Sequence, residues 1–536
     1  MTRIQETISS LSLSRCAVFA AVLSLAGCGG GGGGGGGPIN PAPPPAGPTW
    51  TAGLFEPSAK FANQCANPRT GNDSSGRPFP DVKGTVLTEN HWLRSWTNEL
   101  YLWYSEVQDR NPADFATADY FNQLKTPALT PSGNPKDQFH FTYPTSVWDS
   151  FSQSGVSAGY GANFAIVSGQ DGQLPRKVLV ALVEANTPAA AAGLLRGDEI
   201  VTVDGVDVAY GSNVTTLNNG LFPNELDKDH AFVIRRNNVS SNLTLRSASV
   251  TSTPVHTVKT LSTPSGNVGY ILFNDHIATA EAGLINAINT LRTQNIQDLV
   301  LDVRYNGGGY LAIASQLSYM IAGDAQTAGR FFERTIFNDK HTATNPVTGR
   351  PLEPTPFYKQ TLGISANTPA GAPLPTLNLP RVFVLTTDDT CSASEAIING
   401  LKGVDFPVIQ IGSATCGKPY GFYDFDNCGT TYFSIQFKGV NAKNFGDYAD
   451  GFLPTTSASV RGDQIEGCPV ADDYSKQLGD PTERMLSVAL SYRGSNACSL
   501  PPSGLSQKLR RPEEVVEGEV LSRPAWREMK ILDLSF

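Results

Sequence analysis

The sequence predicts an α/β fold: a layered core on a largely parallel sheet, preceded by a β-rich domain and a helical N-terminal domain. From Val268 to Gly412, strand patterns alternate with helix patterns, which is typical of parallel sheets covered by helices. Residues 151–250 instead contain short β-branched runs bounded by turn residues. Residues 51–150 contain one strongly periodic aromatic segment among loops rich in proline, glycine and asparagine.

The first residues have the pattern of an export signal. Two arginines precede an apolar run that is too short to span a bilayer and that ends in LAGC at residues 25–28. This ending resembles a bacterial lipobox, which implies that residues 1–28 are a lipoprotein signal peptide with Cys28 as the lipidated residue. The alternative is an ordinary signal peptide with an incidental cysteine. Because Gly29 follows, the resemblance implies an outer-membrane lipoprotein of a Gram-negative host, facing the periplasm or the surface.

Residues 29–50 are predicted to be a solvated tether, because a run of glycines followed by a proline-rich stretch cannot build a core. The rest of the chain is long enough for several domains. A net charge of −9 with only 17% charged residues argues against nucleic acid as a partner, since that binding depends on clustered lysines and arginines.

Of the eight cysteines, all but Cys16 and Cys28 belong to the folded part, and an even number suggests disulfides in an oxidising compartment. The sequence alone does not fix their pairing. Short loops favour Cys416 with Cys428 and Cys468 with Cys498, which leaves Cys65 for Cys391. A metal site is the alternative, but no CxxC or paired His and Cys spacing supports it.

The N-terminal domain is expected to contain one long helix from Asn90 to Val107. Its buried face is predicted from large side chains at three- and four-residue intervals, namely Trp92, Trp96, Leu100 and Trp103. Core packing is the usual role of such a stripe, and a ligand-binding aromatic box is the alternative.

Residues 151–250 are predicted to contain strands at 177–183 and 199–205. The segment TPAAAAGLLRGDEIVTVDG, which follows the first strand and runs through the second, resembles the most recognisable part of a PDZ domain. The turn Gly159-Tyr160-Gly161-Ala162 stands where PDZ domains keep their carboxylate-binding loop. Backbone N–H groups in such a turn can bind a chain-terminal carboxylate while the peptide adds to the sheet as a strand. The resemblance therefore implies a peptide-binding domain.

The core is expected over residues 251–490, with a tail at 491–536. Its predicted strands are 268–273, 298–304, 381–387 and 407–412. Its predicted helices cover 280–292 and begin after Tyr310 and at Ser392.

Ser392 lies where the strand 381–387 gives way to a helix, in the segment TCSASEAI. On this pattern alone it is the N-cap of the helix, with Glu395 three residues later completing a capping box. A role as nucleophile requires a base and an oxyanion site elsewhere in the chain.

Lys418, in IGSATCGKPYGF, is the candidate base, because the ten residues before it carry no charge. Burial disfavours the ammonium form, so a neutral amine able to accept the serine proton is feasible. An exposed lysine on a glycine-rich turn is the alternative. The oxyanion candidates are the N–H of Ala393 and one from Gly307 to Gly309, which follow a strand and allow close backbone approach.

Together these segments, in this order after a PDZ-like domain, resemble the C-terminal-processing (tail-specific) serine proteases. The matching motifs are LDVRYNGGG, SASE and the T-x-G-K of residues 415–418. The resemblance implies a crotonase-like protease core with an inserted PDZ-like domain. It also implies these roles: Ser392 as nucleophile, Lys418 as general base, Ala393 with Gly308 or Gly309 as the oxyanion site, and Glu395 and Thr415 as supports of the dyad.

The chain departs from the family in two respects. Many members carry an aspartate eleven residues after the serine, where this chain has Gly403, with Asp405 two positions later. The spacing from Ser392 to Lys418 is also one residue longer than in the members that align with it. Neither difference removes the dyad.

We therefore expect a serine endopeptidase without a metal or cofactor, acting on proteins with flexible C-terminal tails that the PDZ domain selects. A catalytically silent peptide-binding lipoprotein is the alternative from another class. A third possibility is an acyl-transfer hydrolase acting on a cell-wall peptide through the same dyad.

The tail ends on the apolar residues Leu534 and Phe536. One hypothesis places Phe536 in the PDZ groove near Gly159, where it competes with substrate. The favoured alternative is that Trp526, Ile531 and Leu532 dock on the core as an edge strand or short helix.

Overall fold

The computed structural model describes residues 47–536 except 74–75, 169–173, 457–461, 499–529 and 533–536, with the backbone alone at 530–532. The predicted signal peptide, Cys28, most of the tether, Trp526 and Phe536 lie outside the described residues. Of the helices that are described, none has the length and apolar character needed to cross a bilayer.

A seven-stranded sheet forms the core, in the order β12-β13-β14-β18-β19-β25-β24. The β12–β13 pair is antiparallel and the other neighbours are parallel, as the alternation of strand and helix patterns predicts. The strands are β12 (Val255–Thr263), β13 (Gly266–Phe273), β14 (Asp298–Asp302), β18 (Val382–Thr386), β19 (Val408–Gly412), β24 (Leu453–Thr455) and β25 (Gln464–Pro469).

Helices cover both faces of this sheet. Leu299 and Leu301 of β14 pack with one set of helices, α6 (Ala280–Arg292), α7 (Leu311–Ala322) and α9 (Ala393–Gly403). Val300, between them, packs with α10 (Arg484–Ser495) on the other face. Because successive side chains of a strand point to opposite faces, strands buried on both sides are almost uniformly apolar. The catalytic candidates are thereby mounted on a rigid frame.

The β-rich domain is a six-stranded sheet in the order β10-β9-β7-β6-β5, with β8 paired to β7. Its elements are β5 (Ala162–Ser168), β6 (Lys177–Val183), α4 (Pro188–Ala191), β7 (Glu199–Val203), β8 (Val206–Asp207), α5 (Val214–Leu221), β9 (Asp229–Arg236) and β10 (Val239–Arg246). A second pair, β4 (Val156–Gly159) and β11 (Ala248–Thr251), flanks it in sequence. Strand β5 is the last strand of the order, so its outer edge is where a peptide strand would add.

The long N-terminal helix ends earlier than predicted. Helix α1 spans Val86–Leu100, and Trp103 lies beyond it, so the predicted helix to Val107 is wrong at its C-terminal end. Tyr101 is extended, and the next N–H, of Leu102, donates to the carbonyl of Ile435. This contact with a distant segment takes the chain out of the helix. Trp92 and Trp96 pack in an aromatic cluster, as core packing predicts.

The remaining elements of residues 51–150 are short helices and strands. They are η1 (Ser58–Lys60), β1 (Gln64–Cys65), β2 (Val82–Lys83), η2 (Tyr104–Glu106), η3 (Pro112–Asp114), α2 (Thr117–Gln123), β3 (Phe141–Pro144) and α3 (Thr145–Ser154). Strand β3 pairs with β22 (Thr430–Phe433), so this part of the chain shares a sheet with residues far downstream.

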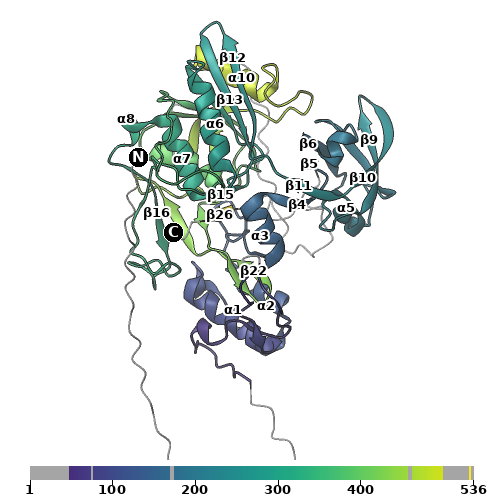
Figure 1. Ribbon diagram of the computed structural model, residues 1–536, viewed down its shortest axis with the longest axis vertical. Helices are drawn as coiled ribbons and strands as arrows, with labels where there is room; N and C mark the ends of the chain where they lie inside the picture. Colours follow the sequence, from purple (N-terminus) through teal and green to yellow (C-terminus); the bar gives the residue numbers. More distant parts are fainter. Residues whose placement is uncertain (1–46, 74–75, 169–173, 457–461, 499–529, 533–536) are drawn as a thin grey trace, which may run out of the picture. The chain divides into compact units, whose positions relative to one another are not determined.

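The elements outside the main sheet are mostly short strands. They are β15 (Gly308–Tyr310), α8 (Asp324–Thr327), β16 (Phe331–Phe337), β17 (Thr355–Pro356), β20 (Tyr420–Gly421), β21 (Phe425–Asn427), β23 (Phe437–Val440) and β26 (Lys530–Leu532). Strand β26 pairs in parallel with β15, and the two are drawn side by side in Figure 1. The tail thus docks on the core as a strand at residues 530–532, in line with the second of the two tail hypotheses.

Two of the three predicted disulfides are wrong. The structure pairs Cys468 with Cys498 as predicted, but Cys391 with Cys416 and Cys65 with Cys428. Cys391 follows β18 and Cys416 follows β19, and the carboxyl ends of adjacent parallel strands meet at one edge of a sheet. Proximity in space, not the shortest loop, therefore decides the pairing.

His140 gives a pH-dependent contribution to stability. Its side chain is 1% exposed and stacks on Phe121, with Nε2 2.8 Å from the Phe121 carbonyl oxygen. Burial lowers the pKa of His140 from its ordinary value of 6.5 to about 4. As the pH falls, the imidazole is therefore protonated in the unfolded chain before it is protonated in the folded protein. The contribution of neutral His140 to the unfolding free energy is complete above pH 6.5 and is lost as the pH falls towards 4.

Lowering the pH from 7 to 5 should reduce the unfolding free energy of both the wild type and His140→Gln. We expect the reduction to be about 2 kcal/mol smaller in His140→Gln. Glutamine stays neutral across this range and keeps a donor for the Phe121 carbonyl. Urea unfolding at the two pH values measures the difference. Parallel pH profiles for the two proteins would contradict the assignment.

Candidate active site

Three loops meet at the carboxyl ends of three neighbouring parallel strands. Strand β14 leads to the glycine turn at 307–309, β18 leads to Ser392, and β19 leads to Lys418. Ligands and catalytic groups of open α/β sheets collect at this edge. The fold thus brings together all three segments that the sequence singles out.

Ser392 does not have the geometry of an ordinary helix N-cap. Its backbone has φ +63° and ψ −118°, whereas an N-cap has extended dihedrals and a serine avoids positive φ. The residue is fully buried, and its Oγ has no hydrogen-bond partner among the residues that the structure describes. Strain of this kind is held at functional sites, where the surrounding structure fixes it. The conformation favours a nucleophile over a structural cap.

Glu395 joins the nucleophile turn to the lysine loop. Its carboxylate accepts hydrogen bonds from the N–H groups of Ser392 (2.8 Å), Gly417 (2.9 Å) and Lys418 (2.8 Å). It also accepts from Thr415 Oγ1 (2.5 Å), which in turn accepts from the Phe452 N–H. Burial raises the pKa of Glu395, and the four donors oppose that rise. Glu395 and Thr415 therefore orient both segments of the candidate dyad.

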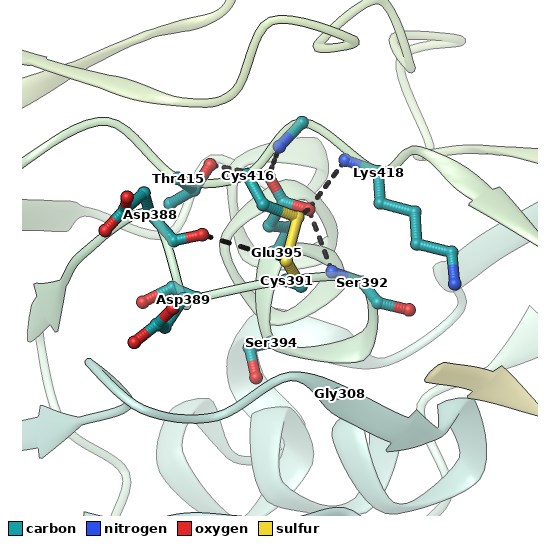
Figure 2. Close-up of a disulfide and its surroundings, with 12 residues drawn as sticks. Gly308, Asp388, Asp389, Cys391, Ser392, Ser394, Glu395, Thr415, Cys416 and Lys418 are labelled. Carbon is teal, nitrogen blue, oxygen red and sulfur yellow. Dashed lines mark hydrogen bonds between the residues drawn. A yellow bond between two sulfur atoms is a disulfide. The ribbon is translucent and has the colours of Figure 1, made fainter. Parts of the chain in front are cut away.

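Lys418 is fully buried, as the uncharged sequence around it predicts. Its Nζ lies 4.1 Å from the centre of the Phe422 ring and 5.0 Å from that of Phe139. In Figure 2 the Lys418 side chain runs from its loop toward Ser392. Neither ring was anticipated from the sequence. Phe422 is a near neighbour in a PYGF segment, but Phe139 comes from the N-terminal domain and carries no local signal.

The glycine turn is held by Asn306, a residue that the sequence analysis missed. Asn306 is fully buried; its Oδ1 accepts from the Gly308 N–H (2.9 Å), and its carbonyl accepts from the Cys391 N–H (3.0 Å). The Gly308 N–H is engaged by Asn306, so Gly309, which is paired with Ile531 of β26, is the remaining oxyanion candidate of the two. Gly309 has φ +137°, and a Cβ there would lie 2.5 Å from the His276 carbonyl oxygen, so only glycine fits.

The second oxyanion candidate, Ala393, is the first residue of α9 and is fully buried. N–H groups in the first turn of a helix have no partner within the helix. At the other end of α9, Gly403 packs close to Asn441, and Asp405 is exposed and pairs with Lys443. Asp405 therefore lies away from the dyad and does not replace the missing family aspartate.

The predicted carboxylate-binding turn joins β4 to β5. Gly161 has φ +77°, and a Cβ there would lie 2.4 Å from Thr187, so this position requires glycine. Tyr160 is buried and its hydroxyl donates to the Gly220 carbonyl, which leaves only its backbone for a ligand. Gly159 ends β4 and Ala162 begins β5, so the turn lies at the start of the edge strand.

Comparison with known proteins gives two family matches. The model for peptidase family S41 matches residues 267–421, which include the glycine turn, Ser392 and Lys418. The PDZ domain model matches residues 159–246. The structure of an S41 protease from Bacteroides fragilis superposes with a TM-score of 0.55 at 21% identity, covering 78% of this chain and 98% of that one. The predicted fold class, an α/β protease core with an inserted PDZ domain, is confirmed.

The curated relatives that match the chain are named carboxyl-terminal-processing proteases or peptidases. The carboxyl-terminal-processing protease of Picosynechococcus sp. is 28% identical over 180 residues, 31% of this chain and 40% of that protein. The chloroplastic carboxyl-terminal-processing peptidase 1 of Arabidopsis thaliana is 24% identical over 352 residues, 63% of this chain and 61% of that protein. The matches thus span less than two thirds of either relative. Residues 267–421 of the chain are thus similar to peptidase family S41, residues 159–246 are similar to a PDZ domain, and the matching relatives are named carboxyl-terminal-processing peptidases.

Proposed function

We propose that the protein is a serine endopeptidase in which Ser392 is the nucleophile and Lys418 the general base. The observation that carries the proposal is the pairing of a buried serine at positive φ with a buried lysine that points toward it. One glutamate, Glu395, binds the backbone of both residues. A structural cap or a surface lysine would need none of these features.

The chemistry follows from these positions. Ser392 Oγ attacks the scissile carbonyl carbon as Lys418 Nζ accepts the hydroxyl proton. The N–H groups of Ala393 and Gly309 stabilise the oxyanion of the tetrahedral intermediate. Lys418 then gives the proton to the leaving amine, and an acyl-enzyme at Ser392 remains. A water molecule, deprotonated by Lys418, hydrolyses the ester and restores Ser392.

Substrate selection is proposed to lie in the PDZ domain. A peptide adds to the edge of β5 while the turn at Gly161 binds its terminal carboxylate. A cavity beside this edge is lined by Gly161 and Phe164 of the PDZ domain and by Asn274 and Tyr305 of the core. Tyr305 directly precedes Asn306 of the glycine turn. A bound tail would therefore lie close to the catalytic segments.

Fluorophosphonate labelling tests the proposed nucleophile directly. We expect stoichiometric labelling at Ser392, located by peptide mass spectrometry, and hydrolysis of an unfolded protein in the presence of a chelator. A fluorogenic peptide with a free C-terminal carboxylate should have a lower KM than its amide. Absence of labelling and of hydrolysis would favour the catalytically silent peptide-binding protein instead.

We further propose that the protein is an outer-membrane lipoprotein anchored at Cys28 and facing the periplasm or the cell surface. The lipobox-like LAGC sequence and three disulfides, which require an oxidising compartment, support this location. Incorporation of a labelled fatty acid in a Gram-negative host, lost in Cys28→Ser, is the test.

Nested truncations of the tail should separate its two proposed roles. Strand β26 pairs with Gly308 to Tyr310, the backbone beside the oxyanion site, so it occupies an edge that an extended substrate would use. We expect a chain ending at residue 529 to have a KM lower by about threefold or more, because an intramolecular competitor is removed. A chain ending at residue 532 keeps β26 and should behave like the wild type. If the chain ending at residue 532 already has a lower KM, the competitor is Phe536 in the PDZ groove and not β26.

A further inference from the structure

The two loops that carry the candidate dyad are joined by a covalent bond. Cys391 directly precedes Ser392, and Cys416 stands two residues before Lys418; their Cα atoms are 5.2 Å apart in the disulfide. Figure 2 shows this disulfide beside Glu395, between the nucleophile turn and the lysine loop. Both cysteines are buried, with 1% and 7% exposure. The bond thus lies inside the catalytic site.

The lysine loop has little regular structure of its own. Residues 414–419 are neither helix nor strand. The loop is attached by the Thr415 and Cys416 N–H groups, which donate to the carbonyls of Phe452 and Thr390, and by its bonds to Glu395. Burial raises the pKa of Glu395, because the charged carboxylate that binds the loop is less stable in the buried site than in water. The disulfide attaches the same loop to the same turn independently of that charge.

From this arrangement we infer that the Cys391–Cys416 disulfide is a positioning element of the dyad, so that peptide hydrolysis requires the oxidised protein. This inference rests on the proposed function. Reduction by a dithiol transfers two electrons and two protons, giving two thiols in the protein and a cyclic disulfide from the dithiol. The lysine loop then keeps its hydrogen bonds and ring contacts but loses its covalent link to the nucleophile turn, so the distance between Lys418 and Ser392 is less tightly fixed. A small misplacement of a base is enough to slow proton transfer strongly.

The chain contains a matched control. Cys468–Cys498 closes a loop of 30 residues, against 25 for Cys391–Cys416, so the two bonds restrict the unfolded chain to a similar degree. Cys468 lies in β25 and packs in the cluster of the α10 face, away from α9. Loss of either bond should lower the melting temperature, but only one of them touches the dyad.

We expect Cys391→Ala/Cys416→Ala to lower kcat by about tenfold or more with KM within about twofold, and to slow fluorophosphonate labelling of Ser392 equally. Cys468→Ala/Cys498→Ala should keep kcat within about twofold of the wild type. Both are assayed below their melting temperatures. Equal kcat in the two double variants, whether high or low, overturns the inference.

Graded reduction of the full-length protein provides a second measurement, which also decides the question if the first double variant does not fold. Activity should fall in proportion to the thiols that alkylation and mass spectrometry detect at Cys391 and Cys416, and should return on reoxidation. The Cys468→Ala/Cys498→Ala variant should lose activity in the same way. Full activity with both thiols alkylatable contradicts the inference. A wild-type protein that neither hydrolyses peptides nor labels at Ser392 would instead refute the proposed function.

Discussion

Replacing either member of the proposed dyad should abolish the proposed hydrolysis. We expect Ser392→Ala, Lys418→Ala and Lys418→Arg each to lower kcat/KM for a fluorogenic peptide by at least about 10³-fold, because nucleophile and base act as one unit. Arginine retains the positive charge but cannot release its proton in a protein, so it does not substitute for the lysine. Initial rates measure the loss, and unchanged melting temperatures for Ser392→Ala show that the fold is intact.

Two lysine variants test whether activity depends on the Lys418 amine. Lys418→Met tests the amine against the packing of the side chain, and Lys402→Met tests Lys418 against another lysine whose pKa is lowered. Lys418→Met keeps an unbranched stem between the two phenylalanine rings and should be as inactive as Lys418→Ala. Lys402, in the helix α9 that follows Ser392, has a pKa that burial lowers to about 8, but its Nζ donates to the carbonyls of Gly462 and Gln464. Lys402→Met should keep activity within about twofold of the wild type. An active Lys418→Met or an inactive Lys402→Met would contradict the assignment of the base.

Elements of the core and of the PDZ domain were predictable where their local patterns agree with their tertiary roles. Helix α6 and strand β6 have the predicted bounds, 280–292 and 177–183, since an apolar period and flanking turn residues mark both. Helix α1 was predicted too long because Trp103 continues the helical spacing of Trp92 and Trp96. Beyond the end of the helix, the Leu102 N–H donates to the carbonyl of Ile435, and no local sequence pattern predicts this distant contact.

The residues of the candidate site were found from the sequence, but their supports were not. Ser392, Lys418 and the glycine turn each follow an apolar strand, and that position can be seen in the sequence. Asn306 stands between the strand and the glycines, where asparagine is a common turn residue, so its position gave a weak signal. No sequence pattern predicts the role of Phe139, because its contact with Lys418 depends on how the N-terminal domain packs.

The disulfides illustrate the same limit. The pairing of Cys391 with Cys416 follows from the adjacency of β18 and β19 in the sheet, which the sequence order alone does not specify. Cys428, at φ +55°, turns the β21–β22 hairpin, and its partner Cys65 lies 363 residues earlier. Loop length favours near neighbours, whereas the folded sheet brings distant cysteines together.

Glu395→Gln should be the most damaging substitution outside the dyad. Each carboxylate oxygen accepts two hydrogen bonds: Oε1 from Thr415 Oγ1 and the Gly417 N–H, and Oε2 from the N–H groups of Ser392 and Lys418. An amide has one NH₂ group, which in either orientation faces two donors instead of accepting from them. Buried donors without an acceptor cost about 1–3 kcal/mol each in stability. We expect kcat to fall by about 100-fold, because the turn and the loop shift relative to each other.

Glu281→Gln is the matched control, because Glu281 is a second buried glutamate with four donors. It accepts from Gln316 Nε2 and from the N–H groups of Leu362, Ile364 and Ser365, none of which belongs to the candidate site. Both variants should lose a similar amount of unfolding free energy in urea, since each leaves two donors facing an amide NH₂. Only Glu395→Gln should lower kcat and slow the labelling of Ser392 by a fluorophosphonate. If the two glutamines cost the same stability and the same activity, Glu395 contributes to the fold alone and does not position the dyad.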